Sequence, residues 1–127
     1  MSGDIDHLLD TNVVIGLLKG HAAALALAEA AGLAPGRFGV SQITRMELLG
    51  YPGLTDAEDE AVRRWLALCR VLTIDDKTEA RAIGLRRRGL LRLPDAIVAA
   101  TALAADAHLL TLDERLARVF GDEVRSA

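Results

Sequence analysis

Four acidic residues stand at positions where a carboxylate could take part in chemistry. Asp10 directly follows one short apolar run of the chain, and Asp113 follows another. Glu47 lies beside the apolar stripe of a predicted helix, where a carboxylate loses hydration unless a cation compensates. Asp95 lies in the first turn of an almost wholly apolar predicted helix, whose dipole favours an ionised carboxylate there. Carboxylates that converge would repel one another unless they share cations.

The chemical type of these side chains indicates which cation they would share. Carboxylate oxygens are hard ligands that suit Mg²⁺ or Mn²⁺, whereas zinc prefers nitrogen and sulfur. His7, His21 and His108 show no zinc-ligand spacing, and Cys69 is the single cysteine. Metal ions held by carboxylates activate water and stabilise charge in phosphodiester cleavage. The four acids therefore predict a metal-dependent nuclease.

Each acid also has an ordinary structural explanation. Asp10 and Asp113 could be helix N-caps, a common task for Asp at strand-to-helix turns. Glu47 could pair with an arginine, and Asp95 could simply stabilise the start of its helix. The combination of the four acids, and no single one of them, favours the catalytic interpretation.

Short apolar runs alternate along the chain with longer helical patterns. Strands are expected at Ile5–Leu9, Arg37–Val40, Val71–Ile74 and His108–Leu110, with a further edge strand in the tail at Glu123–Ser126. Helices are expected through Leu18 and at His21–Ala31, Ser41–Leu49, Asp56–Cys69, Glu79–Arg88, Asp95–Asp106 and Asp113–Val119. This alternation predicts a three-layer α/β/α fold around a mostly parallel sheet of four or five strands. Such sheets bind ligands at the carboxyl ends of their strands, where Asp10 and Asp113 fall.

Size and composition limit the possible classes of protein. The 127 residues, 51% of them hydrophobic, fit one domain over residues 1–127 with a core that needs no disulfide. The single cysteine and the absence of a signal-peptide pattern favour the cytoplasm, and no apolar stretch reaches the roughly 18 residues of a membrane span. The net charge of −3 argues against nonspecific binding of nucleic acid over the whole surface. The 3% aromatic content argues against base stacking as the main source of affinity.

The four acids lie in segments that together resemble the four motifs of PIN-domain nucleases. These segments are Leu8–Ile15, Ser41–Gly50, Leu93–Ala102 and Leu110–Asp113. They occur in the family's order, and the resemblance covers the chain from about Leu8 to Phe120. The fourth segment departs from the pattern at Leu112, where a polar or basic residue is common. Among the small stand-alone members of the family, the sequence is most similar to VapC-type toxins of prokaryotic toxin–antitoxin pairs.

The resemblance implies an activity and a set of partners. Proteins of this type are Mg²⁺- or Mn²⁺-dependent endoribonucleases, the toxins of type II toxin–antitoxin pairs. A cognate antitoxin holds such a toxin inactive, and the toxin is usually a homodimer that forms a heterotetramer or a larger assembly with the antitoxin. The implied substrate is RNA, and no membrane is involved.

The resemblance also implies roles for individual residues. Asp10 and Asp95 would be the main metal ligands, and Asp113 would complete or assist the metal site. Glu47 would position or activate the attacking water. The side chains implied as hydrogen-bonding support for the carboxylates are Asn12 and Thr111.

Two features of the sequence leave their interpretation open. The run Arg86–Arg88, with Arg81 and Arg92 nearby, could contact RNA phosphates or an antitoxin, or form a solvated helix end. The apolar surplus of Val13–Leu18 and His21–Ala31 could be extra core, a dimer interface or an antitoxin surface.

Other classes of protein fit the sequence less well. A phosphoacceptor signalling domain would need a lysine well after its central Asp, and no lysine follows Lys77. A haloacid-dehalogenase-type phosphatase would need a second Asp where Asn12 stands. The alternatives that stay open are a catalytically idle binding module of the same fold and a DNA-directed nuclease.

Overall fold

The computed structural model describes residues 4–126 of the chain and places four strands in one sheet. The strands are β1 (His7–Leu9), β2 (Phe38–Ser41), β3 (Arg70–Leu72) and β4 (His108–Leu110). Their order is β3-β2-β1-β4, and every neighbouring pair is parallel. The first strand of the chain therefore lies in the interior of the sheet, directly beside the last.

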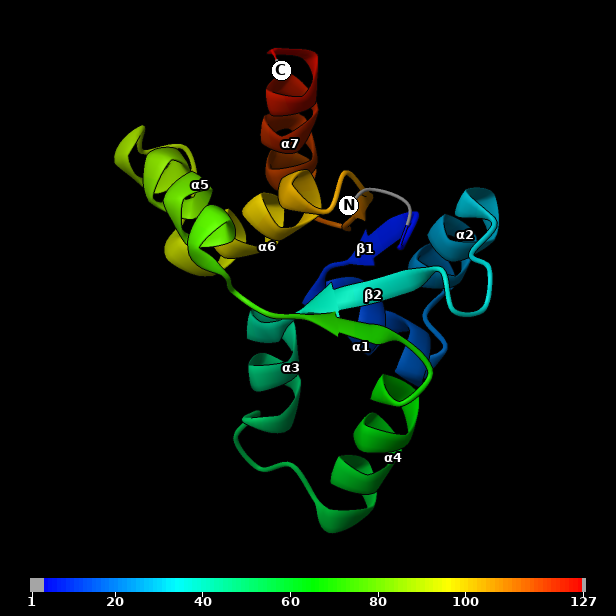
Figure 1. The fold of residues 1–127 in the computed structure, drawn as a ribbon. Helices are drawn as coiled ribbons and strands as arrows, with labels where there is room; N and C mark the ends of the chain where they lie inside the picture. The colour runs from blue at the N-terminus through cyan, green and yellow to red at the C-terminus, as the bar shows by residue number, and fades with distance from the viewer. Residues whose placement is uncertain (1–3, 127) are drawn as a thin grey trace.

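Helices cover both faces of this sheet, as Figure 1 shows. One face carries α1 (Thr11–Lys19), α3 (Gln42–Leu49) and α4 (Asp56–Leu66), with α2 (Ala22–Ala31) packed against α1. The other face carries α5 (Asp76–Arg87), α6 (Leu93–Ala104) and α7 (Glu114–Ser126). The predicted three-layer α/β/α fold with a parallel sheet is confirmed.

The alternation of side chains along β1 divides the core in two. Successive residues of a strand point to opposite faces of the sheet. Leu8 belongs to the cluster under α5, α6 and α7, and Leu9 belongs to the cluster against α1, α3 and α4, each with no exposed surface. The interior strand β1 is buried on both faces. The residue that follows it, Asp10, is therefore held at the carboxyl ends of the strands, between the two helical layers.

Helix boundaries mostly follow signals that the sequence carries. The Ser41 hydroxyl accepts a hydrogen bond from the Ile43 N–H and caps α3. Gly32 ends α2 in the left-handed conformation, at a φ of 64°. Helix α5 begins earlier than expected, at Asp76, because the Asp75 carboxylate caps it by accepting from the Thr78 N–H.

The predicted edge strand in the tail is wrong. Residues 123–126 form the last turn of α7. Leu116, Val119 and Phe120, spaced three to four residues apart, are buried and give this helix its apolar face. Glu123 continues that face and forms an ion pair with Arg88 at 2.9 Å, which ties α7 to the end of α5.

Among the described residues, no single helix is both long and apolar enough to cross a membrane. Within residues 4–126, one pair of helices, α1 and α2, reaches the required length and hydropathy together, and the chain bends by 111° between them.

Candidate active site

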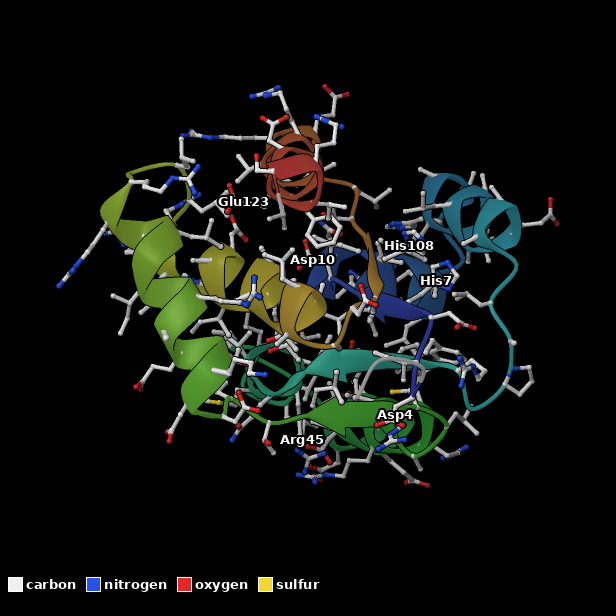
Figure 2. All side chains as sticks on the ribbon, turned by 45° about the horizontal axis from the view of Figure 1, so that its top comes forward. Asp4, His7, Asp10, Arg45, His108 and Glu123 are labelled. Carbon is white, nitrogen blue, oxygen red and sulfur yellow. The ribbon has the colours of Figure 1, made fainter. Side chains whose placement is uncertain are left out.

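Asp10 lies at the carboxyl end of β1, buried and held at both carboxylate oxygens. Only 5% of its surface is exposed. Its Oδ1 accepts a hydrogen bond from the Thr11 N–H at 2.8 Å, and its Oδ2 accepts from the Thr111 hydroxyl at 2.7 Å. Figure 2 shows Asp10 at the opposite end of β1 from His7 and His108. Asp10 is thus the expected N-cap of α1 and also a rigidly oriented carboxylate.

Thr111 and Asn12 connect the ends of β1 and β4. The Thr111 hydroxyl accepts from the Asp113 N–H at 3.0 Å while it donates to Asp10. The Asn12 amide donates to the Thr111 hydroxyl at 3.4 Å, and its oxygen accepts from the Leu112 N–H at 3.1 Å. These bonds supply the hydrogen-bonding support around the carboxylates that the family resemblance implies for Asn12 and Thr111.

Asp113 caps the start of α7. Its Oδ1 accepts hydrogen bonds from the backbone N–H groups of Arg115 and Leu116, at 2.9 and 3.1 Å. The structural explanation offered for Asp113 from the sequence is therefore correct. It does not compete with a functional one, since the capped carboxylate is close enough to Asp10 for its charge to raise the pKa of that acid.

Glu47 is oriented by a threonine from another helix. Its Oε1 accepts from the Thr11 hydroxyl at 2.6 Å, and that hydroxyl also lies 3.0 Å from the hydroxyl of the buried Thr44. Within residues 4–126, no arginine lies within ion-pair distance of Glu47. The interpretation as half of an arginine pair is thus not supported.

Thr11 and Thr44 are site residues that the sequence reasoning missed. Their positions carried a signal, because Thr11 directly follows Asp10 and Thr44 stands one helical turn before Glu47.

Asp95 joins the other acids from the first turn of α6, where it is half-buried. Burial is the largest cause of its raised pKa, and the negative charges of Asp10 and Asp113 raise this pKa further. The positive charge of Arg92 acts in the opposite direction. Asp95 is therefore close enough to two other acids to feel their charge.

The pKa of Asp10 is raised as well, mainly by burial. The hydrogen bonds from Thr111 and Thr11 oppose that shift, whereas the charges of Glu47 and Asp113 add to it. The structure thus brings the four predicted acids to one edge of the sheet, where their negative charges act on one another. Such a group favours a cation.

The donor set suits a hard divalent ion. Within residues 4–126, no three His, Cys, Asp or Glu side chains are spaced as a ready-made metal site, so Asp10, Asp95 and Asp113 do not form a closed group of three ligands. Mg²⁺ does not require one, since it is usually bound by one or two carboxylates together with waters and substrate phosphates. The buried Asp10 and the half-buried Asp95 offer carboxylate oxygens, which fit Mg²⁺ or Mn²⁺ and not zinc, an ion that prefers nitrogen and sulfur.

A separate apolar cavity lies between α1, α3 and α4. It is lined mainly by Ile15, Leu18, Leu48, Tyr51, Leu54 and Val62, and by none of the four acids. The Tyr51 side chain at its rim is 61% exposed. Part of the apolar surplus of α1 therefore faces an open groove and not the core.

The sequence and the fold of this chain are similar to those of known proteins. A family model for the PIN domain matches residues 7–121, a range that includes all four acids. A chain of a toxin–antitoxin complex from Klebsiella pneumoniae is 31% identical, with 85% of this chain and 87% of that chain covered and a TM-score of 0.73.

Two further solved structures share the fold. VapBC-1 from nontypeable Haemophilus influenzae is 23% identical over 93% of this chain and 94% of that chain, with a TM-score of 0.73. FitAcB from Neisseria gonorrhoeae is 24% identical over 91% and 93%, with a TM-score of 0.71. No curated protein matches the chain significantly.

Proposed function

Because this chain belongs to the PIN-domain family, we propose that it is a metal-dependent endoribonuclease and the toxin of a type II toxin–antitoxin pair. The family membership confirms the resemblance found in the four sequence motifs, and PIN domains are generally nucleases. The observation that carries the proposal is the edge of the sheet where Asp10, Glu47, Asp95 and Asp113 act on one another. Carboxylates in that arrangement suit phosphodiester hydrolysis.

The proposed chemistry assigns each acid a task. Asp10 and Asp95 would hold Mg²⁺ or Mn²⁺, with Asp113 assisting. The bound ion would lower the pKa of a water molecule and stabilise charge on the attacked phosphate. Glu47, held by the Thr11 hydroxyl, would orient that water and take its proton as the water oxygen bonds to phosphorus. The bond from phosphorus to the leaving ribose oxygen would then break, and that oxygen would take up a proton from solvent.

The proposal includes a protein partner. The 31% identical chain belongs to a toxin–antitoxin complex, and the groove between α1, α3 and α4 exposes Leu18 and Tyr51 at 39% and 61%. An amphipathic segment of a cognate antitoxin would cover these side chains. We include in the proposal a homodimer that joins the antitoxin in a heterotetramer or larger assembly, and action in the cytoplasm, where RNA is present.

The test is cleavage by the purified full chain. Total RNA is incubated with the protein in Mg²⁺ or Mn²⁺, with EDTA as a control and with the Asp95→Asn variant in parallel. Asp106→Asn is the matched variant, because Asp106 is exposed beyond the other end of α6 with a φ of 55°, a conformation that Asn tolerates well. We expect discrete fragments from the wild type and Asp106→Asn, and none with EDTA or with Asp95→Asn.

Other outcomes distinguish the alternatives. Fragments that persist with Asp95→Asn would show a contaminating nuclease or a site elsewhere. Preferential cleavage of single-stranded DNA would indicate a DNA-directed enzyme. No cleavage of either nucleic acid, together with a melting temperature that Mg²⁺ leaves unchanged, would favour the idle binding module.

A further inference from the structure

The arginines of this chain divide into those with an acidic partner and those without one. On α4, Arg63 and Arg64 each form an ion pair at 2.7 Å with an acid one turn earlier, Asp59 and Glu60. Those guanidinium charges are already balanced. The other described arginines that have a partner are Arg37, Arg70, Arg88 and Arg125.

The arginines nearest the carboxylates belong to the second group. Arg92 and Arg115 are exposed, and no acid within residues 4–126 lies within ion-pair distance of either. Arg92 is the N-cap residue of α6, three residues before Asp95, and its charge opposes the raised pKa of that acid. Arg115 is in the first turn of α7, and its backbone N–H donates to Asp113. Two exposed arginines without an ion pair to a described residue therefore belong to the helix starts that carry Asp95 and follow Asp113.

The basic run at the end of α5 extends this pattern. Arg88 is neutralised by Glu123, and Figure 2 shows Glu123 between α7 and the end of α5. Arg86 and Arg87, in the last turn of α5, are exposed and make no ion pair with a described residue. Only four residues, 88 to 91, separate them from Arg92. Exposed arginines without an ion pair to a described residue thus stand on both sides of the segment that joins α5 to α6.

We propose that Arg92 and Arg115 bind the RNA phosphates that flank the scissile phosphate, and that Arg86 and Arg87 bind phosphates further along the strand. This inference rests on the proposed ribonuclease function. A guanidinium forms bidentate hydrogen bonds with phosphate and stays charged at any physiological pH. Contacts of this kind position the backbone without reading bases. The chain has a net charge of −3 and four acids in its site. The proposed arginine–phosphate contacts would let it bind RNA at that site without attracting nucleic acid over its whole surface.

RNA is favoured over an acidic protein segment because the charge of Arg92 acts on Asp95, and Arg115 lies in the helical turn that Asp113 caps. An antitoxin covering the groove between α1, α3 and α4 would touch residues of the other helical layer, where Arg63 and Arg64 are already paired. Arginines without an acidic partner near a hydrolytic site attract the negatively charged phosphates of the substrate that binds there.

The experiment measures binding of a fluorescein-labelled single-stranded RNA by anisotropy, in Mg²⁺, over a series of salt concentrations. The Asp95→Asn chain is the starting protein, so that the RNA stays intact. Arg92→Gln/Arg115→Gln is compared with Arg63→Gln/Arg64→Gln, which removes the same net charge from α4. Each lost phosphate contact should weaken binding about fivefold at about 0.1 M salt and reduce the slope of log affinity against log salt by about 0.7. The α4 variant should keep both values.

Cleavage by the same pairs with Asp95 intact gives a second readout, in which KM should rise more than kcat falls. Equal affinity and slope for the two double variants would overturn the inference while the ribonuclease proposal stands. Loss of antitoxin binding with unchanged RNA binding would assign these arginines to the partner. A wild-type chain that neither binds nor cleaves RNA would refute the function itself, and the inference with it.

Discussion

At the scale of single residues, one hydroxyl group holds two of the site acids. Thr111 donates to Asp10 and accepts from the Asp113 N–H. Replacing Thr111 by Val keeps its shape but leaves Oδ2 of a buried carboxylate without that donor. Such a loss costs about 1–3 kcal/mol, and partners of this kind typically change metal affinity or activity by about 10- to 100-fold.

Thr111→Val should therefore lower both the free energy of unfolding and the rate of RNA cleavage. Urea denaturation and cleavage kinetics measure the two effects. Thr73→Val, at an exposed position in the loop after β3, is the matched control and should change neither strongly. Full activity of Thr111→Val would show that the bond to Asp10 has no part in the site.

The sequence predicts the four acids well but not the side chains that orient them. An acid after a buried strand of a parallel sheet falls at the ligand-binding edge, and this rule finds Asp10 and Asp113 without knowledge of any contact. The Thr11–Glu47 bond joins residues 36 positions apart on two helices, so it depends on how α1 packs against α3. No local pattern encodes that distance.

At the scale of elements, the packing of α1 against α2 requires a glycine. A Cβ atom added to Gly16 would lie 2.5 Å from the Cβ of Ala24, which neither helix can accommodate without moving. Gly84 is also inside a helix, α5, but a Cβ added there would meet nothing within 4 Å. The two glycines therefore have different reasons to be present.

Gly16→Ala should destabilise the protein by about 1–3 kcal/mol through overpacking. Gly84→Ala should stabilise it by about 0.5–1 kcal/mol, because alanine loses less backbone entropy in a helix. Urea denaturation of both variants measures the difference. Stabilisation by Gly16→Ala would mean that α1 and α2 are packed less closely than described.

The pairing of β1 with β4 places two imidazoles side by side. His7 and His108 are opposite each other in the strand register, with ring centroids 5.6 Å apart. Burial lowers the pKa of His7, and the charge of His108 lowers it further, against the opposing effect of Asp6. Because the folded-state pKa lies below the ordinary value of about 6.5, the unfolded chain binds this proton more readily. His7 therefore makes its full contribution to stability above about pH 6.5, the pKa of the unfolded chain. That contribution decreases as the pH falls from 6.5 towards the lower pKa of the folded state.

His108→Gln should raise the pKa of His7 and flatten this part of the pH dependence of stability. An NMR titration of the histidine ring protons measures the first effect, and urea denaturation between about pH 7.5 and 5 measures the second. His21→Gln is the matched control, since His21 is exposed at the start of α2 and forms no side-chain cap there. An unchanged His7 titration in His108→Gln would contradict the coupling.

At the scale of the whole molecule, the site is a concentration of like charge that the fold must hold together. A metal ion that binds only the folded chain stabilises it by mass action, by about 2.7 kcal/mol at a hundredfold excess over its dissociation constant. Mg²⁺ should therefore raise the melting temperature in a saturable way. Asp95→Asn should lose most of this rise, and Asp106→Asn should keep it.

Sodium chloride at equal ionic strength is the control for screening of charge. An equal rise for the wild type and Asp95→Asn would mean that Mg²⁺ acts elsewhere on the surface. In the metal-free protein, Asp95→Asn should itself be slightly more stable than the wild type, since it removes one of the mutually repelling charges.

The overall architecture could be predicted because strands and helices alternate in the sequence with clear caps between them. The order of the strands could not, since it depends on contacts between distant segments. His7 and His108 become neighbours only because β1 pairs with β4. The predicted strand in the tail is wrong because four residues, 123–126, carry too little periodicity to separate a strand from a helix. The whole of α7 shows the helical period plainly.

The pairing of β1 with β4 also has a consequence for the synthesis of the protein on the ribosome. Asp10 is translated before the backbone that it bonds to, at Leu110, and before the hydroxyl that orients it, at Thr111. We therefore expect a nascent chain to lack a working site until the segment that includes Leu110 and Thr111 has been made. A chain with the proposed ribonuclease activity would in this way be unable to cut its own messenger while that segment is still missing.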